Sequence, residues 1–82
     1  MPLDEPVIEP EALSDAALAA HGLTRRESET LRHVATGATN DQIAARLDVS
    51  PRTVQKHLEH VYGKLGVGTR MAAIAKVGGR LA

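Results

Sequence analysis

The chain has 82 residues, no cysteine, a single aromatic side chain, and ten basic against ten acidic residues. This length fits one small domain, and the absence of cysteine excludes disulfide bonds and thiolate zinc sites. No apolar run approaches the roughly 20 residues of a membrane-spanning helix, and no signal-peptide pattern stands at the start. We therefore expect a soluble, cytoplasmic protein with an aliphatic and alanine core, a composition that suits packed helices.

The charges are divided between two parts of the chain, although they sum to zero. Residues 1–22 hold five acidic residues and no Lys or Arg, which gives −5. Residues 23–82 hold all ten basic and the other five acidic residues, so that 10 − 5 gives +5. The sequence thus predicts an acidic leader over 1–22 and a basic domain over 23–82, an asymmetry compatible with nucleic-acid binding.

The leader is expected to be extended and partly disordered in its first part, where prolines at positions 2, 6 and 10 stand among acids. The stretch LSDAALAAHG then predicts one weak helix, with Ser14 as N-cap and Gly22 as its stop. A helix this short is marginal by itself in water. It is either a linker turn or a strut that leans on the domain.

Four further helices are predicted after the leader, and no segment shows the alternation of a strand. LTRRE is a capping box, in which the side chains of Thr24 and Glu27 each accept a hydrogen bond from the backbone amide of the other residue. The helix that it starts ends at Gly37. TNDQ is a second capping box, formed by Thr39 and Gln42. It starts a short helix.

The next two helices are marked in the same way. A helix over 51–65 follows the cap Ser50, has proline in its first turn and ends before a glycine. A last helix follows the cap Thr69 and runs to about Val77. The short helix over 40–47 is separated from the helix over 51–65 by three residues, which are the dimensions of a helix-turn-helix.

The helix over 51–65 has one apolar and one polar face. At about 100° per residue, its apolar residues fall within a stripe about 60° wide that must face the core: Val54, Leu58, Val61 and Leu65. The far side and its flanks carry polar side chains and a glycine: Arg52, Gln55, Lys56, Glu59, His60 and Gly63. Such a face is most often simply solvated, but the second helix of a helix-turn-helix is the one that enters the DNA major groove.

These motifs resemble a known family. LTxRE, GxTNxxIAxxL, SxxTVxxH and KLGVxxR occur in the order and spacing of the LuxR-type (GerE-type) helix-turn-helix domain of bacterial transcription regulators, over roughly residues 23–77. The resemblance implies an all-α, four-helix DNA-binding domain that is not an enzyme. It also implies that the last helix serves as a dimer contact.

The resemblance assigns base reading to the residue after TV, its neighbours one turn away and a residue near the helix start: Arg52, Gln55, Lys56 and Glu59. By their chemistry, Gln55 can pair with adenine, Lys56 with guanine, and Glu59 can accept from cytosine N4. An acidic residue departs from the basic or neutral one typical of the last position. Glu59 therefore either selects a cytosine or pairs with Lys56 or Arg52.

Phosphate contacts are expected near the helix starts and along one side of the reading helix: Thr39, Asn40, Thr53, His57, Lys64 and Arg70. His57 either reaches a phosphate or packs at the edge of the core. Glu27 is expected to act as a cap, with Arg70 as a further partner.

The last helix is expected to turn Met71, Ile74 and Ala75 into the core. The opposite side is the predicted dimer contact: Ala72, Ala73, Lys76 and Val77. No metal or cofactor is predicted, because two histidines three residues apart on one helix lack the further ligands that zinc needs. No nucleophile–base arrangement supports catalysis.

The sequence as a whole predicts the output domain of a bacterial transcription regulator that binds double-stranded DNA sequence-specifically, with the helix over about 51–65 in the major groove. A homodimer on DNA is the expected assembly, RNA polymerase is a further candidate partner, and the bound protein would be associated with the nucleoid. The alternative is a helical protein-interaction module that keeps the fold without specific DNA binding.

Overall fold

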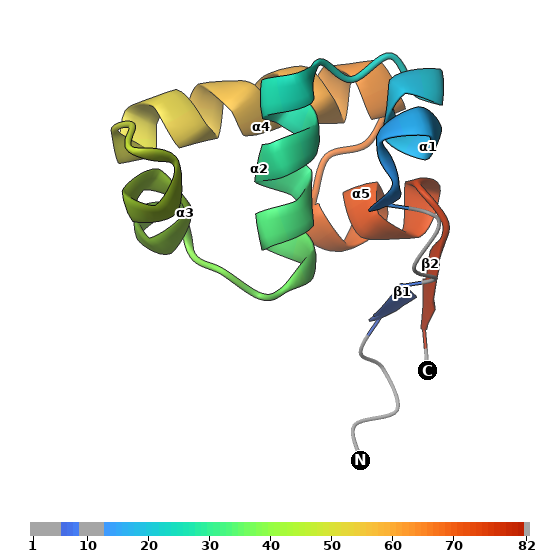
Figure 1. The fold of residues 1–82 in the computed structure, drawn as a ribbon. Helices are drawn as coiled ribbons and strands as arrows, with labels where there is room; N and C mark the ends of the chain where they lie inside the picture. Colours follow the sequence, from blue (N-terminus) through green and yellow to red (C-terminus); the bar gives the residue numbers. More distant parts are fainter. Residues whose placement is uncertain (1–5, 9–12, 82) are drawn as a thin grey trace.

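The computed structural model describes residues 6–8 and 13–81 (Figure 1). The described part is all-α apart from two three-residue strands, and the predicted fold class is confirmed. In chain order its elements are β1 (Pro6–Ile8), α1 (Asp15–Ala20), α2 (Arg25–Ala35), α3 (Asn40–Leu47), α4 (Pro51–Leu65), α5 (Arg70–Lys76) and β2 (Gly79–Leu81).

Both predicted capping boxes are present. The Thr24 hydroxyl accepts from the Glu27 amide at 3.2 Å, and the Glu27 carboxylate accepts from the Thr24 amide at 2.8 Å. Thr39 and Gln42 repeat this pair at the start of α3, with the same two distances. Each box satisfies amides that the first turn of a helix leaves without partners, so local chemistry sets where α2 and α3 begin.

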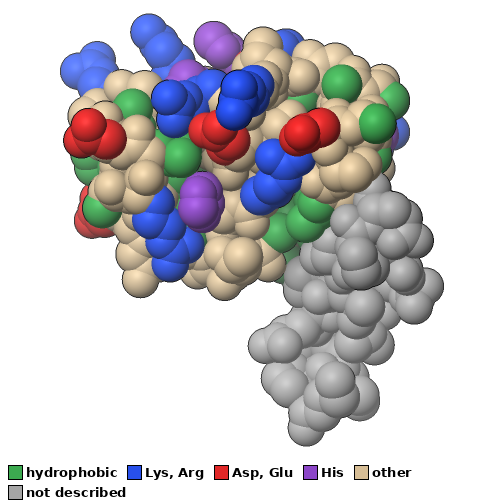
Figure 2. Space-filling model, viewed as in Figure 1, with side chains coloured by type: hydrophobic (Ala, Val, Ile, Leu, Met, Phe, Trp, Pro, Cys, Tyr) green, Lys and Arg blue, Asp and Glu red, His purple; other side chains and the backbone are tan. Residues whose placement is uncertain are grey.

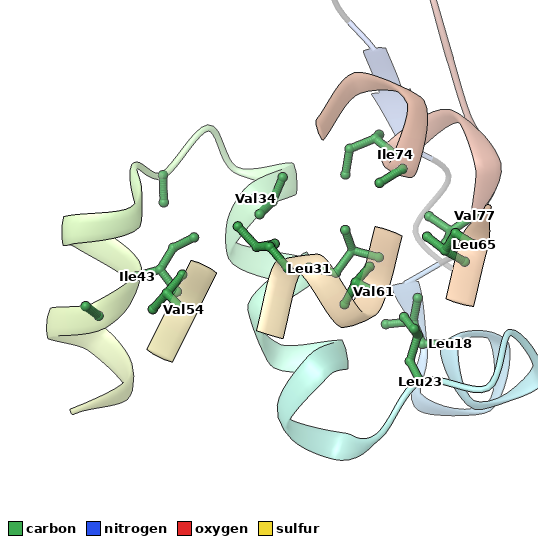
Figure 3. Packing of buried hydrophobic residues seen from close by; sticks show 14 residues of the cluster. Leu18, Leu23, Leu31, Val34, Ile43, Val54, Val61, Leu65, Ile74 and Val77 are labelled. Atoms are coloured by element: carbon green, nitrogen blue, oxygen red, sulfur yellow. The ribbon is translucent and has the colours of Figure 1, made fainter. Parts of the chain in front are cut away.

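The core is organised around α4, which runs along one edge of the molecule and contacts α2, α3 and α5 (Figure 1). Its predicted apolar stripe is buried, with no member more than 5% exposed: Val54, Leu58, Val61 and Leu65. Figure 3 shows Ile43 of α3 beside Val54 near one end of this core, and Leu31 of α2 beside Val61 near its middle. One face of α4 is therefore buried in the core, and only the opposite face is accessible to a ligand.

Helix α1 is a strut and not a linker turn. Leu18 is completely buried and lies beside Leu23 in the common core (Figure 3). Arg32 of α2 reinforces the contact, since its Nε donates to the Leu13 carbonyl at 2.8 Å and its Nη2 to the Asp15 carboxylate.

The two strands were not predicted. β1 and β2 pair antiparallel, with Val7 opposite Arg80, and so bring two distant segments of the chain together (Figure 1). Three residues are too few for an alternating pattern to be recognised, and the pairing is carried by the backbone. The predictions for residues 1–5 and 9–12 of the leader lie outside the described residues.

The predicted faces of α5 were correct only in part, because Ile74 lies in the core and Lys76 is exposed as expected, but the other core and surface positions differ. Ala73, Ile74 and Val77 are buried, at 0%, 3% and 5% exposure, whereas Met71 is 48% exposed and Ala75 is also exposed. The sequence MAAIA has no polar residue to fix the phase of so short a helix, and the core instead uses the i, i+4 pair of Ala73 and Val77. These two residues are therefore unavailable as a dimer contact.

Replacement of Leu18 by alanine is expected to lower the free energy of unfolding by about 2–4 kcal/mol, because a fully buried side chain would leave a cavity. Met71→Ala is the control, since it truncates an exposed side chain and should change stability by less than about 1 kcal/mol. Urea unfolding measures both. A loss for Leu18→Ala no larger than that of the control would show that α1 is not part of the cooperative core.

Candidate nucleic-acid interface

The outer side of α4 carries the four side chains predicted to read bases. Arg52, Gln55, Lys56 and Glu59 are all exposed and together line a shallow hollow of about 280 Å³. We call these four residues the reading face. The structure thus brings the predicted set together on one surface, because the opposite stripe of the same helix is buried against three other helices.

The turn between α3 and α4 sets how the reading face is presented. Asp48 ends α3 in a left-handed conformation (φ 55°, ψ 48°), which Asp adopts more readily than most residues. The Val49 amide donates to the Ala44 carbonyl at 3.0 Å, and the Ser50 hydroxyl accepts from the Thr53 amide at 3.1 Å. All three residues of the turn therefore have defined roles, and the N-terminal end of α4 is fixed relative to α3.

The reading face carries two basic residues, Arg52 and Lys56, and one acidic residue, Glu59. Figure 2 shows Lys and Arg side chains over the upper part of the molecule, where α2 and α4 lie, with acidic side chains between them. Within the described part of the chain, Glu59 forms no ion pair with Arg52 or Lys56.

Several of the predicted phosphate contacts already have partners inside the fold. Arg70 donates from Nη1 to the Ala38 carbonyl at 3.0 Å and from Nη2 to Oδ1 of Asn40. The hydroxyls of Thr39 and Thr53 lie at the starts of α3 and α4, where Thr39 is the cap and Thr53 lies 3.0 Å from the Ser50 hydroxyl. His57 is half-buried.

The expected pairing of Glu27 with Arg70 was wrong, because Lys64 occupies that role. The Lys64 ammonium donates to Glu27 Oε1 at 2.6 Å, and His60 Nδ1 lies 3.8 Å from Glu27 Oε2. Lys64 and Glu27 are 37 residues apart, so no local pattern in the sequence could have revealed this contact. The signal that could have helped is that Glu27 stands one turn before Leu31 on the buried side of α2, while Lys64 falls on a flank of the buried stripe of α4.

Glu27 is a buried carboxylate with charged and hydrogen-bonded partners, and only 4% of its surface is exposed. Burial raises the pKa of the Glu27 carboxyl, but the hydrogen bonds from Lys64 and the Thr24 amide and the charge of Lys64 outweigh it. The net effect lowers the pKa from the ordinary value of 4.5. An ionised Glu27 therefore joins the start of α2 to the C-terminal end of α4 at neutral pH.

A tight three-residue turn between two helices, of which the second presents an exposed polar face, defines a helix-turn-helix protein. The family model described as bacterial regulatory proteins of the luxR family matches residues 21–77. The chain belongs to this family.

Named relatives agree with the family. A putative HTH-type transcriptional regulator of Mycobacterium bovis is 52% identical over 52 residues, which are 63% of this chain and 6% of that protein. The probable transcriptional regulatory protein SgaR of Hyphomicrobium methylovorum is 53% identical over 53 residues, 65% of this chain and 25% of the relative. The probable transcriptional regulatory protein NarL of Mycobacterium tuberculosis is 46% identical over 61 residues, 74% of this chain and 28% of the relative.

The chain thus spans between 6% and 28% of the length of these relatives. The family and the names of these relatives are those of transcriptional regulators and not of enzymes. None of the helices described here is long and apolar enough to cross a membrane.

Replacement of Glu27 by glutamine tests the buried ion pair. Because the pKa of Glu27 is lowered in the folded state, its charge stabilises the fold above the unfolded-state pKa, and this contribution is lost as the pH falls through the folded-state pKa. Wild type should exceed Glu27→Gln in stability by about 1–3 kcal/mol near pH 7, and the difference should shrink as the pH is lowered below the ordinary carboxyl value of 4.5.

Denaturant unfolding at several pH values measures this difference. Glu29→Gln is the matched control, because Glu29 forms only exposed pairs with Arg25 and Arg26, which are worth little. A gap between wild type and Glu27→Gln that stays constant over this pH range would contradict the assigned ion pair.

Proposed function

We propose that the chain binds double-stranded DNA sequence-specifically, as the output domain of a transcription regulator, with α4 in the major groove. The observation that carries this proposal is the reading face, four exposed polar side chains gathered around one hollow on the outer side of α4. α4 is the second helix of a helix-turn-helix, the position that meets base edges in this motif. Membership in the luxR family supports the same conclusion.

Each member of the reading face has a base that its chemistry fits. The Gln55 amide can pair with N6 and N7 of adenine, and the Lys56 ammonium can donate to O6 and N7 of guanine. Glu59, whose carboxylate has no ion pair with its basic neighbours in the described structure, can accept from N4 of cytosine. Arg52, in the first turn, lies where it can reach either a base or the backbone.

The flanks of this surface would hold the DNA backbone. Thr39 and Asn40 at the start of α3, together with Thr53 and His57 on α4, are proposed as phosphate contacts. Lys64 and Arg70 bring positive charge to the same flanks while they retain Glu27 and Asn40 as partners. Residues 23–82 thus provide the binding surface, and the segment over 1–22 contributes α1 as a brace.

A homodimer is the proposed assembly on DNA. One small domain buries little surface, so useful affinity requires two domains on half-sites about one helical turn apart. Because Ala73 and Val77 lie in the core, the proposed dimer contact on α5 consists of Ala72, Lys76 and the exposed Met71. RNA polymerase as a partner and a place on the cytoplasmic nucleoid follow from the same proposal.

Fluorescence anisotropy of the purified chain with a randomised duplex pool tests the function. Titrations at low salt and at about 0.15 M salt, followed by sequencing of the bound fraction, should show binding that weakens by about 0.9 log unit per log unit of salt for each neutralised phosphate. An enriched inverted repeat would support a dimeric, sequence-specific regulator. Binding without enrichment would contradict sequence specificity.

A protein-interaction module is the second candidate. A hollow of about 440 Å³ beside the exposed Met71, lined by the end of α2 and the start of α5, is the surface that favours it. No duplex binding even at low salt would select this alternative.

Lys56→Ala is expected to reduce the preference for the enriched duplex over a scrambled one by about 1–3 kcal/mol, the worth of one base contact. Arg25→Ala removes one positive charge from an exposed site on α2, which has no assigned role in DNA or dimer contact, and should leave the preference unchanged. Competition anisotropy measures both variants. Equal discrimination by wild type and Lys56→Ala would show that the reading face has been assigned to the wrong residues.

A further inference from the structure

Gly63 lies inside α4, two residues before the helix ends at Leu65, and is exposed. Its φ is not positive, so the backbone does not require glycine there. A Cβ added at Gly63 would meet no atom within 4 Å, so packing within the fold does not require glycine either. Glycine in a helix lowers stability relative to alanine, and at this position nothing in the described fold compensates for that loss.

The position of Gly63 on the helix indicates which ligand would benefit from the absence of a side chain there. At about 100° per residue, Arg52, Lys56 and Gly63 fall within about 40° of one another, directly opposite the buried stripe. Gly63 is also one turn beyond Glu59. The outward side of α4 therefore continues from the reading face to a surface without a side chain, toward the C-terminal end of the helix.

The dimensions of DNA make such a surface useful. An α-helix with its side chains is about 10–12 Å across, and the major groove is about 12 Å wide. A side chain on the DNA-facing side of the helix, away from the base contacts, would meet the duplex first and hold the helix out of the groove. A glycine there permits a close approach of helix and ligand backbones.

We propose that Gly63 is the point at which α4 and the sugar–phosphate backbone of the bound duplex approach most closely, and that its missing side chain lets the reading face reach the bases. This inference rests on the proposed function. In this proposal Gly63 determines how deeply α4 enters the major groove. It forms no hydrogen bond to a base.

The test uses Gly63→Ala and Gly63→Leu in the full chain. The probes are the duplex that wild type enriches from the randomised pool and a scrambled duplex. Gly63→Ala should raise the unfolding midpoint by about 4 °C, because alanine favours the helix. Both variants should nevertheless bind the enriched duplex more weakly, Gly63→Leu by about tenfold or more, the scale of one lost base contact. The scrambled duplex should be affected less.

Gly68→Ala and Gly68→Leu are matched controls. Gly68 is exposed, has no positive φ, has open space around its Cβ position and lies outside α4. These substitutions should leave affinity for both duplexes unchanged. A gain in stability with a loss in affinity cannot come from a damaged fold, so this pair of opposite effects would support the proposal.

If wild type binds the enriched duplex and the Gly63 variants bind it equally well or more tightly, the proposal is overturned while the proposed function stands. An equal loss of affinity for the enriched and scrambled duplexes would also overturn it. The contacts between the reading face and the bases would then be unchanged. If wild type binds no duplex, the proposed function itself fails.

Discussion

Burial of one stripe of α4 is the constraint on which the rest of the structure depends. Val54, Leu58, Val61 and Leu65 are in contact with a core supplied by several other helices, and they leave the helix only one side free. A helix fixed along one edge in this way cannot rotate, so the polar residues of the opposite edge share one outward surface. The candidate interface is in this sense a consequence of hydrophobic packing.

Polar contacts then fix the ends of the helices around this core. The buried Glu27 caps α2 and also holds Lys64 near the end of α4, while Arg70 ties the start of α5 to the start of α3. Charge-assisted bonds of this kind between elements distant in sequence limit the relative movement of the helices. A rigid arrangement matters for recognition, because base contacts depend on side chains that are already positioned.

Local signals in the sequence were sufficient for most of the fold. The bounds of α3 and α4, both capping boxes and the buried stripe of α4 followed from capping chemistry and helical spacing, which act over a few residues. The gathering of Arg52, Gln55, Lys56 and Glu59 followed for the same reason.

Features that depend on contacts between distant segments were not predictable. The partners of Glu27 and Arg70 are set by how helices pack, the β1–β2 pairing is carried by the backbone, and the phase of α5 is ambiguous in a run of small apolar residues. The role of α1 was left open because its sequence fits a linker as well as a strut. The burial of Leu18 and the hydrogen bonds from Arg32 to Leu13 and Asp15 distinguish the two.

We propose above all that the outer face of α4 is the surface that binds duplex DNA. Titration of the isotope-labelled chain with the enriched duplex, followed by amide-resolved NMR, tests it most directly. The account predicts that the largest chemical-shift changes fall on Arg52, Gln55, Lys56, Glu59 and Gly63, with smaller ones at the start of α3. Changes concentrated around Met71 and the end of α2, with α4 unaffected, would contradict it.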